Sequence, residues 1–266
     1  MSTKVKLYPG TYKNYADDIY KAIRHETFGE DIGQNSWLTA DEYRSFFSLL
    51  HLGNNTRVLE IASGSGGPAV FMVKETGCHL TGLEYDKNGV DNSLKLAEAN
   101  GLTGQTKFLH GDASKPLPFE DNSFDAVFTI DAINHLKNRE RVFKEFYRVL
   151  KAGGRLLYTD PIVVTGILTN EEIAVRSSIG YFLFTPLGEN ERLLSAAGFK
   201  DIRSNDVTEN MSSVSQKWYN AREKRKGDLL KIEDEENYNG LQKFFKMVHT
   251  LSSEKRLSRI MFTALK

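Results

Sequence analysis

The stretch VLEIASGSGGPAV, residues 58–70, decides the fold of this chain. A short apolar run passes into small residues and glycines, and Pro68 follows, a residue favoured at the first position of a helix. The stretch therefore predicts a strand, a tight glycine turn and a helix. The spacing of Gly64, Gly66 and Ala69 fits the pattern of a turn that binds a dinucleotide. We expect a ligand site at this turn. The residues around the turn indicate which ligand binds there.

The composition limits the class of protein. The chain has 266 residues, and 35 Lys and Arg balance 35 Asp and Glu, so the net charge is zero. A neutral chain argues against nucleic acid or an anionic membrane as a partner, because both are bound through excess positive charge. The single cysteine, Cys78, excludes a disulfide framework and a cysteine-rich metal site, and we expect no metal. The start is polar and no apolar run is long, so we expect no signal peptide, no membrane segment and a cytoplasmic protein.

Strands and helices alternate along most of the chain. The expected strands cover 57–62, 79–85, 106–111, 125–130, 155–160, 200–207 and 256–266. Helical patterns lie between most of them, which predicts an α/β fold with a doubly wound, mostly parallel sheet. Ligands of such sheets bind outside the carboxyl ends of the strands.

Further helices are expected outside this alternation. Residues 11–27 predict one helix, and a second begins at Thr39, which forms a capping-box pair with Glu42. Another helix is expected near 171–183, and the segment 208–254 is long enough to form a helical cap over the carboxyl edge of the sheet. The chain is divided accordingly into an N-terminal helical segment that closes the active site (1–53), a cofactor-binding core (54–207), the cap (208–254) and a last core strand (255–266).

Three acids distinguish between the possible ligands of the glycine turn. Glu60 would lie beside a bound pyrophosphate, and two like charges 4 Å apart at an effective dielectric constant near 20 cost roughly 4 kcal/mol. S-Adenosylmethionine carries a sulfonium and an ammonium instead, which reverses the sign of this interaction. Glu84 ends the second strand, where an acid accepts hydrogen bonds from ribose hydroxyls, and Asp112 follows the third strand, where an acid can accept from the adenine amine. Together the three acids favour S-adenosylmethionine.

The chain resembles the class I S-adenosylmethionine-dependent methyltransferases in the motifs VLEIASGSGG, GLEYD, GDASKPLPFEDNSFDAVF and GGRLLYTD, over residues 55–205. The resemblance implies a Rossmann-like seven-stranded sheet whose last strand runs antiparallel. It implies that the cofactor contacts Gln34, Glu60, Ala62, Gly64, Ser65, Gly66, Glu84, Tyr85, Asp112, Ala113 and Asp131. The motifs FGEDIGQNSW and DAINHL further resemble small-molecule N-methyltransferases, such as those that act on phosphoethanolamine, sarcosine and dimethylglycine.

The segment IDAINHL after the fourth strand carries the candidate catalytic residues. Asp131 and His135 lie four residues apart, and they face the same way if the segment is helical. An amine nucleophile must be neutral, and an imidazole with a pKa of about 6.5 can take its proton near physiological pH. We expect His135 to act as the base, directly or through a water, and Asp131 to orient His135 or the substrate ammonium. The resemblance to the phosphoethanolamine enzymes implies the same two positions.

Aromatic side chains gather in the N-terminal segment and in the region after the fifth strand. Aromatic faces attract methylated ammonium groups. The candidates for substrate contact are Tyr15, Tyr20, Trp37, Tyr181 and Trp218. Packing of a lid against the core is an alternative explanation for the same residues, and the sequence leaves both open.

Two features depart from the phosphoethanolamine enzymes. Pro161 follows Asp160, where those enzymes have a tyrosine. Their phosphate-binding arginine has no counterpart in register, and the nearby candidates are Arg176 and Arg192. A phosphorylated substrate, a smaller amine, an amino acid and an unphosphorylated natural product therefore all stay open.

The expected function is transfer of a methyl group from S-adenosylmethionine to a small-molecule amine, by in-line displacement with a histidine base. O- or C-methylation of a natural product stays open as an alternative. A nicotinamide-dependent oxidoreductase explains the glycines but not Glu60, and a methyltransferase-like fold that binds ligand without catalysis is a third class. The sequence identifies neither the acceptor nor the oligomeric state.

Overall fold

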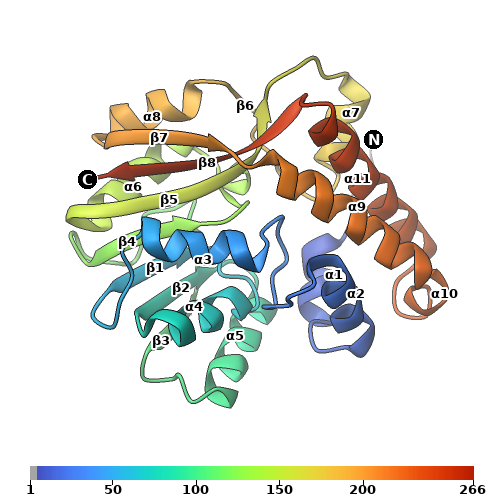
Figure 1. The fold of residues 1–266 in the computed structure, drawn as a ribbon, viewed down its shortest axis with the longest axis horizontal. Helices are drawn as coiled ribbons and strands as arrows, with labels where there is room; N and C mark the ends of the chain where they lie inside the picture. The colour runs from blue at the N-terminus through green and yellow to red at the C-terminus, as the bar shows by residue number, and fades with distance from the viewer. Residues whose placement is uncertain (1–4) are drawn as a thin grey trace.

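The structure, a computed structural model, describes residues 5–266 and is built around one sheet (Figure 1). The strands follow the order β3-β2-β1-β4-β5-β8-β7, and β6 pairs with β5 outside this path. Their bounds are β1 Arg57–Ile61, β2 His79–Glu84, β3 Thr106–His110, β4 Phe124–Thr129, β5 Leu150–Val164, β6 Thr185–Pro186, β7 Lys200–Asp206 and β8 Leu257–Leu265. The β1, β2, β3, β4 and β5 pairings are parallel, and β8 runs antiparallel between β5 and β7.

The expected α/β sheet with an antiparallel last strand is confirmed, with one more strand than expected. The sheet has eight strands instead of seven. The additional strand, β6, has two residues and pairs Val163 of β5 with Thr185. A strand of this length shows no alternation in the sequence, so it could not be predicted.

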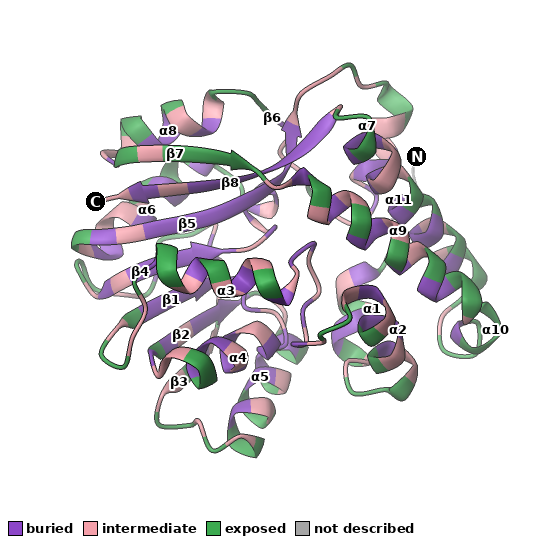
Figure 2. Cartoon of the chain, viewed as in Figure 1, coloured by how far each residue is buried: buried purple, intermediate pink, exposed green. Residues whose placement is uncertain are grey.

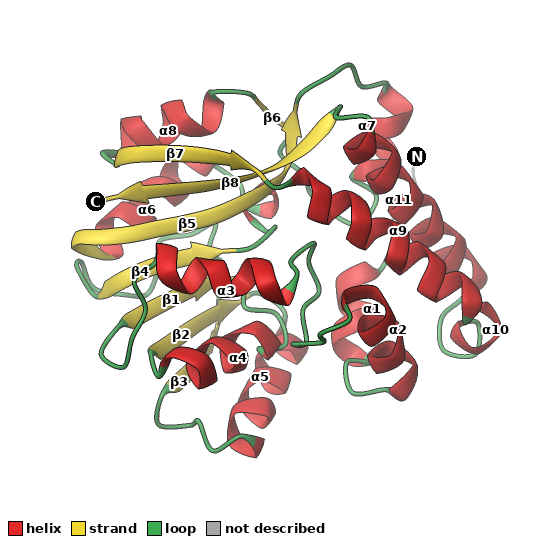
Figure 3. Cartoon of the chain, viewed as in Figure 1, coloured by secondary structure: helices red, strands yellow, loops and turns green. Residues whose placement is uncertain are grey.

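Helices cover both faces of the sheet (Figure 3). One face carries α3 (Ala40–Leu49), α4 (Gly67–Thr76) and α5 (Lys87–Ala99), and the other carries α6 (Arg139–Val149) and α8 (Glu189–Ala197). Successive strand residues point to opposite faces. Val58 therefore joins the core under α3 and α4, and Leu59 joins the core under α6. Both are fully buried, as Figure 2 shows for the centre of the sheet, which explains the apolar run of β1.

The N-terminal segment forms two helices rather than the single helix expected over 11–27. They are α1 (Leu7–Lys13) and α2 (Asp18–Phe28). The backbone leaves helical geometry at Asn14 and is extended at Asp17, so the two helices present different faces. The helix expected at Thr39 is confirmed, because the Thr39 hydroxyl accepts a hydrogen bond from the amide of Glu42.

The cap lies at the carboxyl edge of the parallel strands. It consists of α9 (Thr208–Lys224), α10 (Lys226–Leu229) and α11 (Glu235–Ser253), and it packs beside α1 and α2 (Figure 1). Trp218 and Phe245 of the cap share an apolar core with Tyr20 and Ile23 of α2. No helix among residues 5–266 has the length and apolar character to cross a bilayer.

The helix expected near 171–183 ends early. The helix α7 covers Asn170–Arg176, and the chain continues as a loop until β6 pairs with β5. This loop runs past the turn that follows β4, where Leu183 donates a backbone hydrogen bond to Asn134. The early end of α7 therefore brings residues 177–183 to the candidate site.

Candidate functional site

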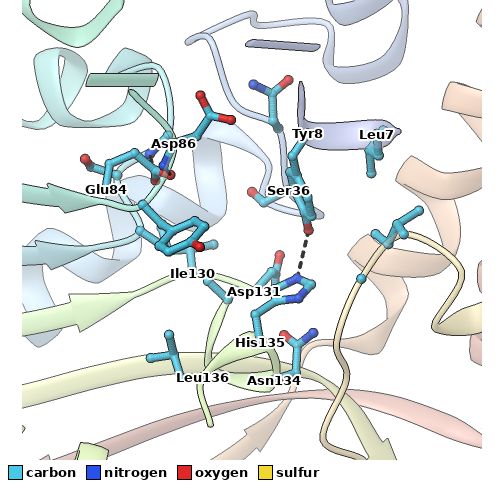
Figure 4. A pocket seen from close by; sticks show the side chains of 18 of the residues that line it. Leu7, Tyr8, Ser36, Glu84, Asp86, Ile130, Asp131, Asn134, His135 and Leu136 are labelled. Carbon is cyan, nitrogen blue, oxygen red and sulfur yellow. Dashed lines mark hydrogen bonds between the residues drawn. The ribbon is translucent and has the colours of Figure 1, made fainter. Parts of the chain in front are cut away.

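A cavity of about 560 Å³ lies between the carboxyl edge of the sheet and the cap. Its walls come from α1, from the loops after β1, β2, β3 and β4, from the segment 176–182, and from Trp218 and Phe244 of the cap. Figure 4 shows Glu84 and Asp86 on one side and His135 with Tyr8 on the other. We refer to the side of Glu60, Glu84 and Asp112 as the acidic end, and to the side of His135, Tyr8, Asn134 and Arg176 as the histidine end.

The glycine turn at the acidic end is held by Glu84. Its Oε2 accepts a hydrogen bond from the amide of Gly64 at 2.8 Å, and its Oε1 accepts from the amide of Asp86 at 2.7 Å. Gly64 has a φ of 57°, a left-handed conformation that favours glycine. A side chain at Gly89 would come within 2.8 Å of the Gly64 carbonyl, so glycine is required for this close approach as well. Glu84 therefore shapes the turn and still lines the cavity.

Glu60 and Ser63 leave polar atoms unpaired at this end. Glu60 is 4 % exposed, and its Oε2 has no hydrogen-bond partner among residues 5–266; the same holds for Ser63 Oγ. Burial, reinforced by the negative charge of Glu84, raises the pKa of Glu60 well above its ordinary value. The raised pKa favours the neutral acid, and a cation placed beside Glu60 would favour its carboxylate. These residues fit the cationic groups of S-adenosylmethionine.

Most of the predicted cofactor residues line this one cavity. They are Glu60, Ala62, Gly64, Ser65, Glu84, Tyr85, Asp112, Ala113 and Asp131. Gln34 and Gly66 do not line it. The Gln34 side chain is buried and bonded to the backbone of Glu30 and Ile32, which makes it a support of the N-terminal loop. Gly66 lies below the turn as the N-terminal cap of α4, packed against Ser93.

Asp131 is held in a buried network and does not orient His135. Its Oδ1 accepts hydrogen bonds from Arg259 Nε at 2.7 Å and Thr159 Oγ1 at 2.8 Å, and its Oδ2 accepts from the Trp37 amide at 2.9 Å. The segment between Asp131 and His135 contains a short 3₁₀ turn, Ile133–His135, so the predicted shared helical face does not exist. Asp131 instead joins the N-terminal loop to the last strand.

Arg259 is a structural residue that the sequence interpretation missed. It is fully buried, and its Nη1 also pairs with Glu42 Oε1 at 2.6 Å. A signal was present, because Arg259 is the one charged residue of a mostly apolar, buried strand. Such a charge predicts a buried partner, although the pattern does not identify Asp131 as that partner.

Both ring nitrogens of His135 are paired. Nδ1 lies 2.9 Å from the Tyr181 carbonyl, which only accepts, so Nδ1 carries the hydrogen. Nε2 lies 3.0 Å from the Tyr8 hydroxyl and accepts its hydrogen, as the dashed line in Figure 4 marks. Burial, with a contribution from the positive charge of Arg176, lowers the pKa of His135 to about 4. His135 is therefore a neutral imidazole, and a weaker base than the sequence suggested.

Tyr8 was not predicted because the expected helix began after it. The observed helix α1 starts at Leu7 and points the Tyr8 ring into the cavity. Burial raises the pKa of the Tyr8 phenol, which keeps it protonated as a donor to His135.

Arg176 places a positive charge inside the histidine end. It is 2 % exposed, lies over the rings of Phe182 and Phe244 at 5.0 and 5.2 Å, and has no carboxylate partner among residues 5–266. Its hydrogen bond to the Pro161 carbonyl is long, at 3.5 Å. Burial lowers the pKa of Arg176 to about 10, so it remains charged at neutral pH. The other candidate, Arg192, lies on the surface and pairs with Glu189.

Three of the five predicted aromatic residues, Trp37, Tyr181 and Trp218, line the cavity. Tyr15 and Tyr20 do not. The Tyr15 ring packs under the guanidinium of Arg24 at 4.5 Å, and Tyr20 belongs to the apolar core of the cap. The break between α1 and α2 turns these two side chains away from the cavity, so packing explains them.

Comparison with known proteins supports the methyltransferase interpretation of the core. Residues 59–158 match the methyltransferase domain family. Sterol 24-C-methyltransferase erg-4 of Neurospora crassa is 29% identical over 217 residues, which are 78% of this chain and 57% of that protein. Phosphoethanolamine N-methyltransferase 1 of Zea mays is 28% identical over 236 residues, 87% of this chain and 46% of that protein. The chain thus spans about half the length of such relatives.

Solved structures share the fold. Phosphoethanolamine N-methyltransferase 2 of Haemonchus contortus, in complex with phosphomonomethylethanolamine and S-adenosylhomocysteine, has a TM-score of 0.81 at 23% identity, covering 97% of this chain and 59% of that one. Mycolic acid cyclopropane synthase CmaA1 has a TM-score of 0.80 at 16% identity, and the match covers 98% of this chain and 99% of that one. The chain therefore carries a methyltransferase domain and has the fold of the S-adenosylmethionine-dependent methyltransferases.

Proposed function

We propose that this protein binds S-adenosylmethionine at the acidic end and methylates the nitrogen of a small anionic amine at the histidine end. The observation that carries the proposal is that Glu60, Glu84, His135 and Arg176 line one continuous cavity. An acceptor with a basic nitrogen and an anionic group matches the histidine end in both charge and polarity. The proposed acceptor is a small molecule. We also propose that the protein is located in the cytoplasm.

The acidic end suits the donor. The cavity-lining acids Asp112 and Glu84 disfavour a pyrophosphate, and buried Glu60 can become a carboxylate beside a ligand with a sulfonium and an ammonium. When bound, S-adenosylmethionine supplies a methyl group that its sulfonium has activated. The methyltransferase domain match favours this donor over the nicotinamide alternative.

The histidine end keeps an amine in its reactive, neutral form. Burial and the charge of Arg176 lower the pKa of His135, and the same two causes lower the pKa of an amine bound beside it. His135 Nε2 then accepts a hydrogen bond from an N–H of the amine, in place of the one that it accepts from the Tyr8 hydroxyl in the structure. Asp131 contributes by holding the Trp37 backbone against the site. In this proposal the N-terminal segment, residues 1–53, closes the site over the acceptor.

Arg176 selects the anionic group of the acceptor. A buried cation without a carboxylate partner is costly unless a ligand supplies the negative charge. A carboxylate and a phosphate both satisfy a guanidinium, so an amino acid and a phosphorylated amine are the two forms that this site accommodates.

C-methylation of a sterol is the second candidate. Sterol 24-C-methyltransferase ERG6B of Gibberella zeae is 42% identical over 120 residues, and the cavity has aromatic walls that include Trp37 and Phe244. The buried charge of Arg176 argues against a wholly apolar acceptor, because it would remain unpaired.

A methyl-transfer assay with labelled S-adenosylmethionine distinguishes these candidates. The panel contains anionic amines, uncharged amines of the same size, and a sterol. We expect labelled product from anionic amines, at rates that His135→Ala reduces. Turnover of the sterol alone would replace the proposal with the second candidate, and turnover that His135→Ala leaves unchanged would remove the role of His135.

A further inference from the structure

Asn134 presents an unpaired amide at the histidine end. It is 1 % exposed, and both Oδ1 and Nδ2 lack a hydrogen-bond partner among residues 5–266. The residue lines the cavity, and Figure 4 shows its amide next to the His135 ring. Leaving a buried polar group unpaired costs about 1–3 kcal/mol. An amide with two unpaired atoms therefore points to a ligand that supplies the partners.

Hydrogen bonds from a neighbouring loop hold the main chain at Asn134 and the ring of His135. Leu183 donates its amide hydrogen to the Asn134 carbonyl at 2.9 Å, and His135 donates from Nδ1 to the Tyr181 carbonyl at 2.9 Å. The loop that contains Tyr181 and Leu183 is thus hydrogen-bonded to two consecutive residues of the 3₁₀ turn. Asn134 and His135 are consecutive residues of this turn and line the same cavity, which allows one amine to contact both.

The neighbouring polar residues show that Asn134 is exceptional here. Asp131 lies three positions earlier and has both carboxylate oxygens paired within the protein. Glu60 and Ser63, which also carry unpaired atoms, belong to the acidic end, and Asn35, another cavity residue, has one unpaired atom, Oδ1, whereas Asn134 has two. Asn134 is thus the side chain beside His135 whose hydrogen-bonding capacity is left for an acceptor.

We propose that Asn134 makes the enzyme select its acceptor by the number of N–H groups on the amine. An amine that is to be methylated points its lone pair at the methyl donor, and one N–H is directed to His135 Nε2. A second N–H of a primary amine can then donate to Asn134 Oδ1, and Nδ2 can donate to an oxygen of the same acceptor. A tertiary amine has no N–H, so its methyl groups would leave the amide unpaired. Acceptor binding should therefore weaken from primary to secondary to tertiary amine.

The proposal rests on the proposed function and is tested by two series of probes. The carboxylate series is glycine, sarcosine and N,N-dimethylglycine; the phosphate series is phosphoethanolamine with its N-methyl and N,N-dimethyl forms. Calorimetry on protein saturated with S-adenosylhomocysteine measures each affinity, and labelled methyl transfer measures each kcat/KM. The series that binds identifies the anion. We expect the affinity to fall about 10-fold with each N–H removed, the equivalent of one hydrogen bond.

Variants of Asn134 separate this role from simple packing. Asn134→Leu keeps the shape without the hydrogen bonds and should bring the affinities of the primary and the secondary amine of a series to within about threefold of each other, while the tertiary amine, which has no N–H for His135, still binds more weakly. Asn134→Asp keeps the acceptor oxygen and should preserve the preference for primary amines. Asn205→Leu, on the exposed edge strand β7, is the matched control, and thermal unfolding checks that each variant is folded.

The experiment separates failure of the role of Asn134 from failure of the proposed function. A wild-type enzyme that binds the tertiary amine of a series as tightly as the primary amine overturns the role of Asn134 and leaves the proposed function in place. The same holds if Asn134→Leu weakens every amine by one common factor. Binding of S-adenosylhomocysteine without binding or turnover of any amine in either series overturns the proposed function, and the role of Asn134 with it. If Asn134→Leu does not fold, the wild-type series and Asn134→Asp decide.

Discussion

The two ends of the cavity are built in different ways. At the acidic end, Glu84 holds Gly64 and Asp86, which lie 20 and 2 positions from it in the sequence. At the histidine end, the pairs Tyr8–His135, His135–Tyr181 and Asp131–Arg259 join residues 127, 46 and 128 positions apart. The donor side therefore depends on local strand-turn-helix units, whereas the acceptor side depends on tertiary contacts among distant segments.

This difference separates binding of the donor from choice of the acceptor. Substitutions at the acidic end should alter affinity for S-adenosylhomocysteine, and substitutions at the histidine end should alter acceptor affinity. The two buried arginines should also differ in their roles. Arg259 has two carboxylate partners, whereas Arg176 has none among residues 5–266.

The largest expected effect is on folding stability, from Arg259→Met. The substitution leaves the buried carboxylates of Asp131 and Glu42 without their cation and should lower the free energy of unfolding by about 3–5 kcal/mol. Urea unfolding at pH 7 measures this change in the free energy of unfolding. The control is Arg203→Met, at an exposed position of β7, which should leave the urea midpoint unchanged. Equal midpoints for the two variants would show that the Arg259 pair does not hold the histidine end to the sheet.

Arg176→Met should reduce the binding of the acceptor without reducing folding stability, the opposite of Arg259→Met. Arg176→Met removes a buried charge that has no carboxylate partner among residues 5–266, so the free energy of unfolding should stay the same or rise. The affinity for anionic amines should fall about 10–100-fold, the equivalent of a charge-assisted hydrogen bond, while uncharged amines and S-adenosylhomocysteine bind as before. Calorimetry with each ligand measures this. Loss of S-adenosylhomocysteine binding in this variant would contradict the separation of the two ends.

His135 should make stability depend on pH. Its pKa is about 4 in the folded protein, against about 6.5 in an unfolded chain. Between these values the unfolded chain binds a proton that the folded chain does not. The contribution of neutral His135 is therefore fully present above pH 6.5 and is lost as the pH falls toward 4, by at most about 1.4 kcal/mol per pH unit.

Chemical unfolding of the wild type and His135→Gln at pH 7 and pH 5 tests this dependence. The wild type should lose more stability on acidification than the variant, and other titrating groups cancel in the comparison. Identical losses would mean that His135 titrates in the folded protein as it does in the unfolded chain.

The smallest expected effect is a proton released at the acidic end. The raised pKa of Glu60 favours its neutral form in the protein without ligand, and binding of a sulfonium beside it should release the proton. Calorimetry of S-adenosylmethionine binding in buffers of different ionisation enthalpy measures the release. Glu60→Gln should abolish it, and S-adenosylhomocysteine, which lacks the sulfonium, should release less. Equal release in the wild type and Glu60→Gln would assign the proton to another group.

Much of the acidic end was predictable because its signals are local. The strand, the turn and the helix of residues 58–70 are consecutive, and Glu84 and Asp112 follow strands that the sequence pattern locates. His135 was predictable as a cavity residue for the same reason. Its neighbour Tyr8 was not predicted, and Arg176 was only one of two candidate arginines, because nothing near them in the sequence shows what they contact.

The errors have one physical origin. Tyr15 and Tyr20 were predicted to contact substrate because aromatic faces attract methylated ammonium groups, but neither lines the cavity, since Tyr15 packs against Arg24 and Tyr20 lies in the apolar core of the cap. Asp131 was assigned to His135 by helical spacing, but its oxygens are taken by Arg259, Thr159 and the Trp37 backbone. A residue's partner depends on where the chain returns, and spacing along the chain does not report this.

The sequence alone determined the sheet, its order of strands and helices, and the position of the acidic end, because backbone propensity and hydrophobic alternation act over a few residues. Only the tertiary structure decided which buried groups are paired and which are left for a ligand. Arg259 and Arg176 are both buried arginines, yet one is neutralised by Asp131 and Glu42 and the other faces the cavity. Hydrogen-bond and charge satisfaction depend on neighbours in space, and these neighbours are set by how distant segments pack.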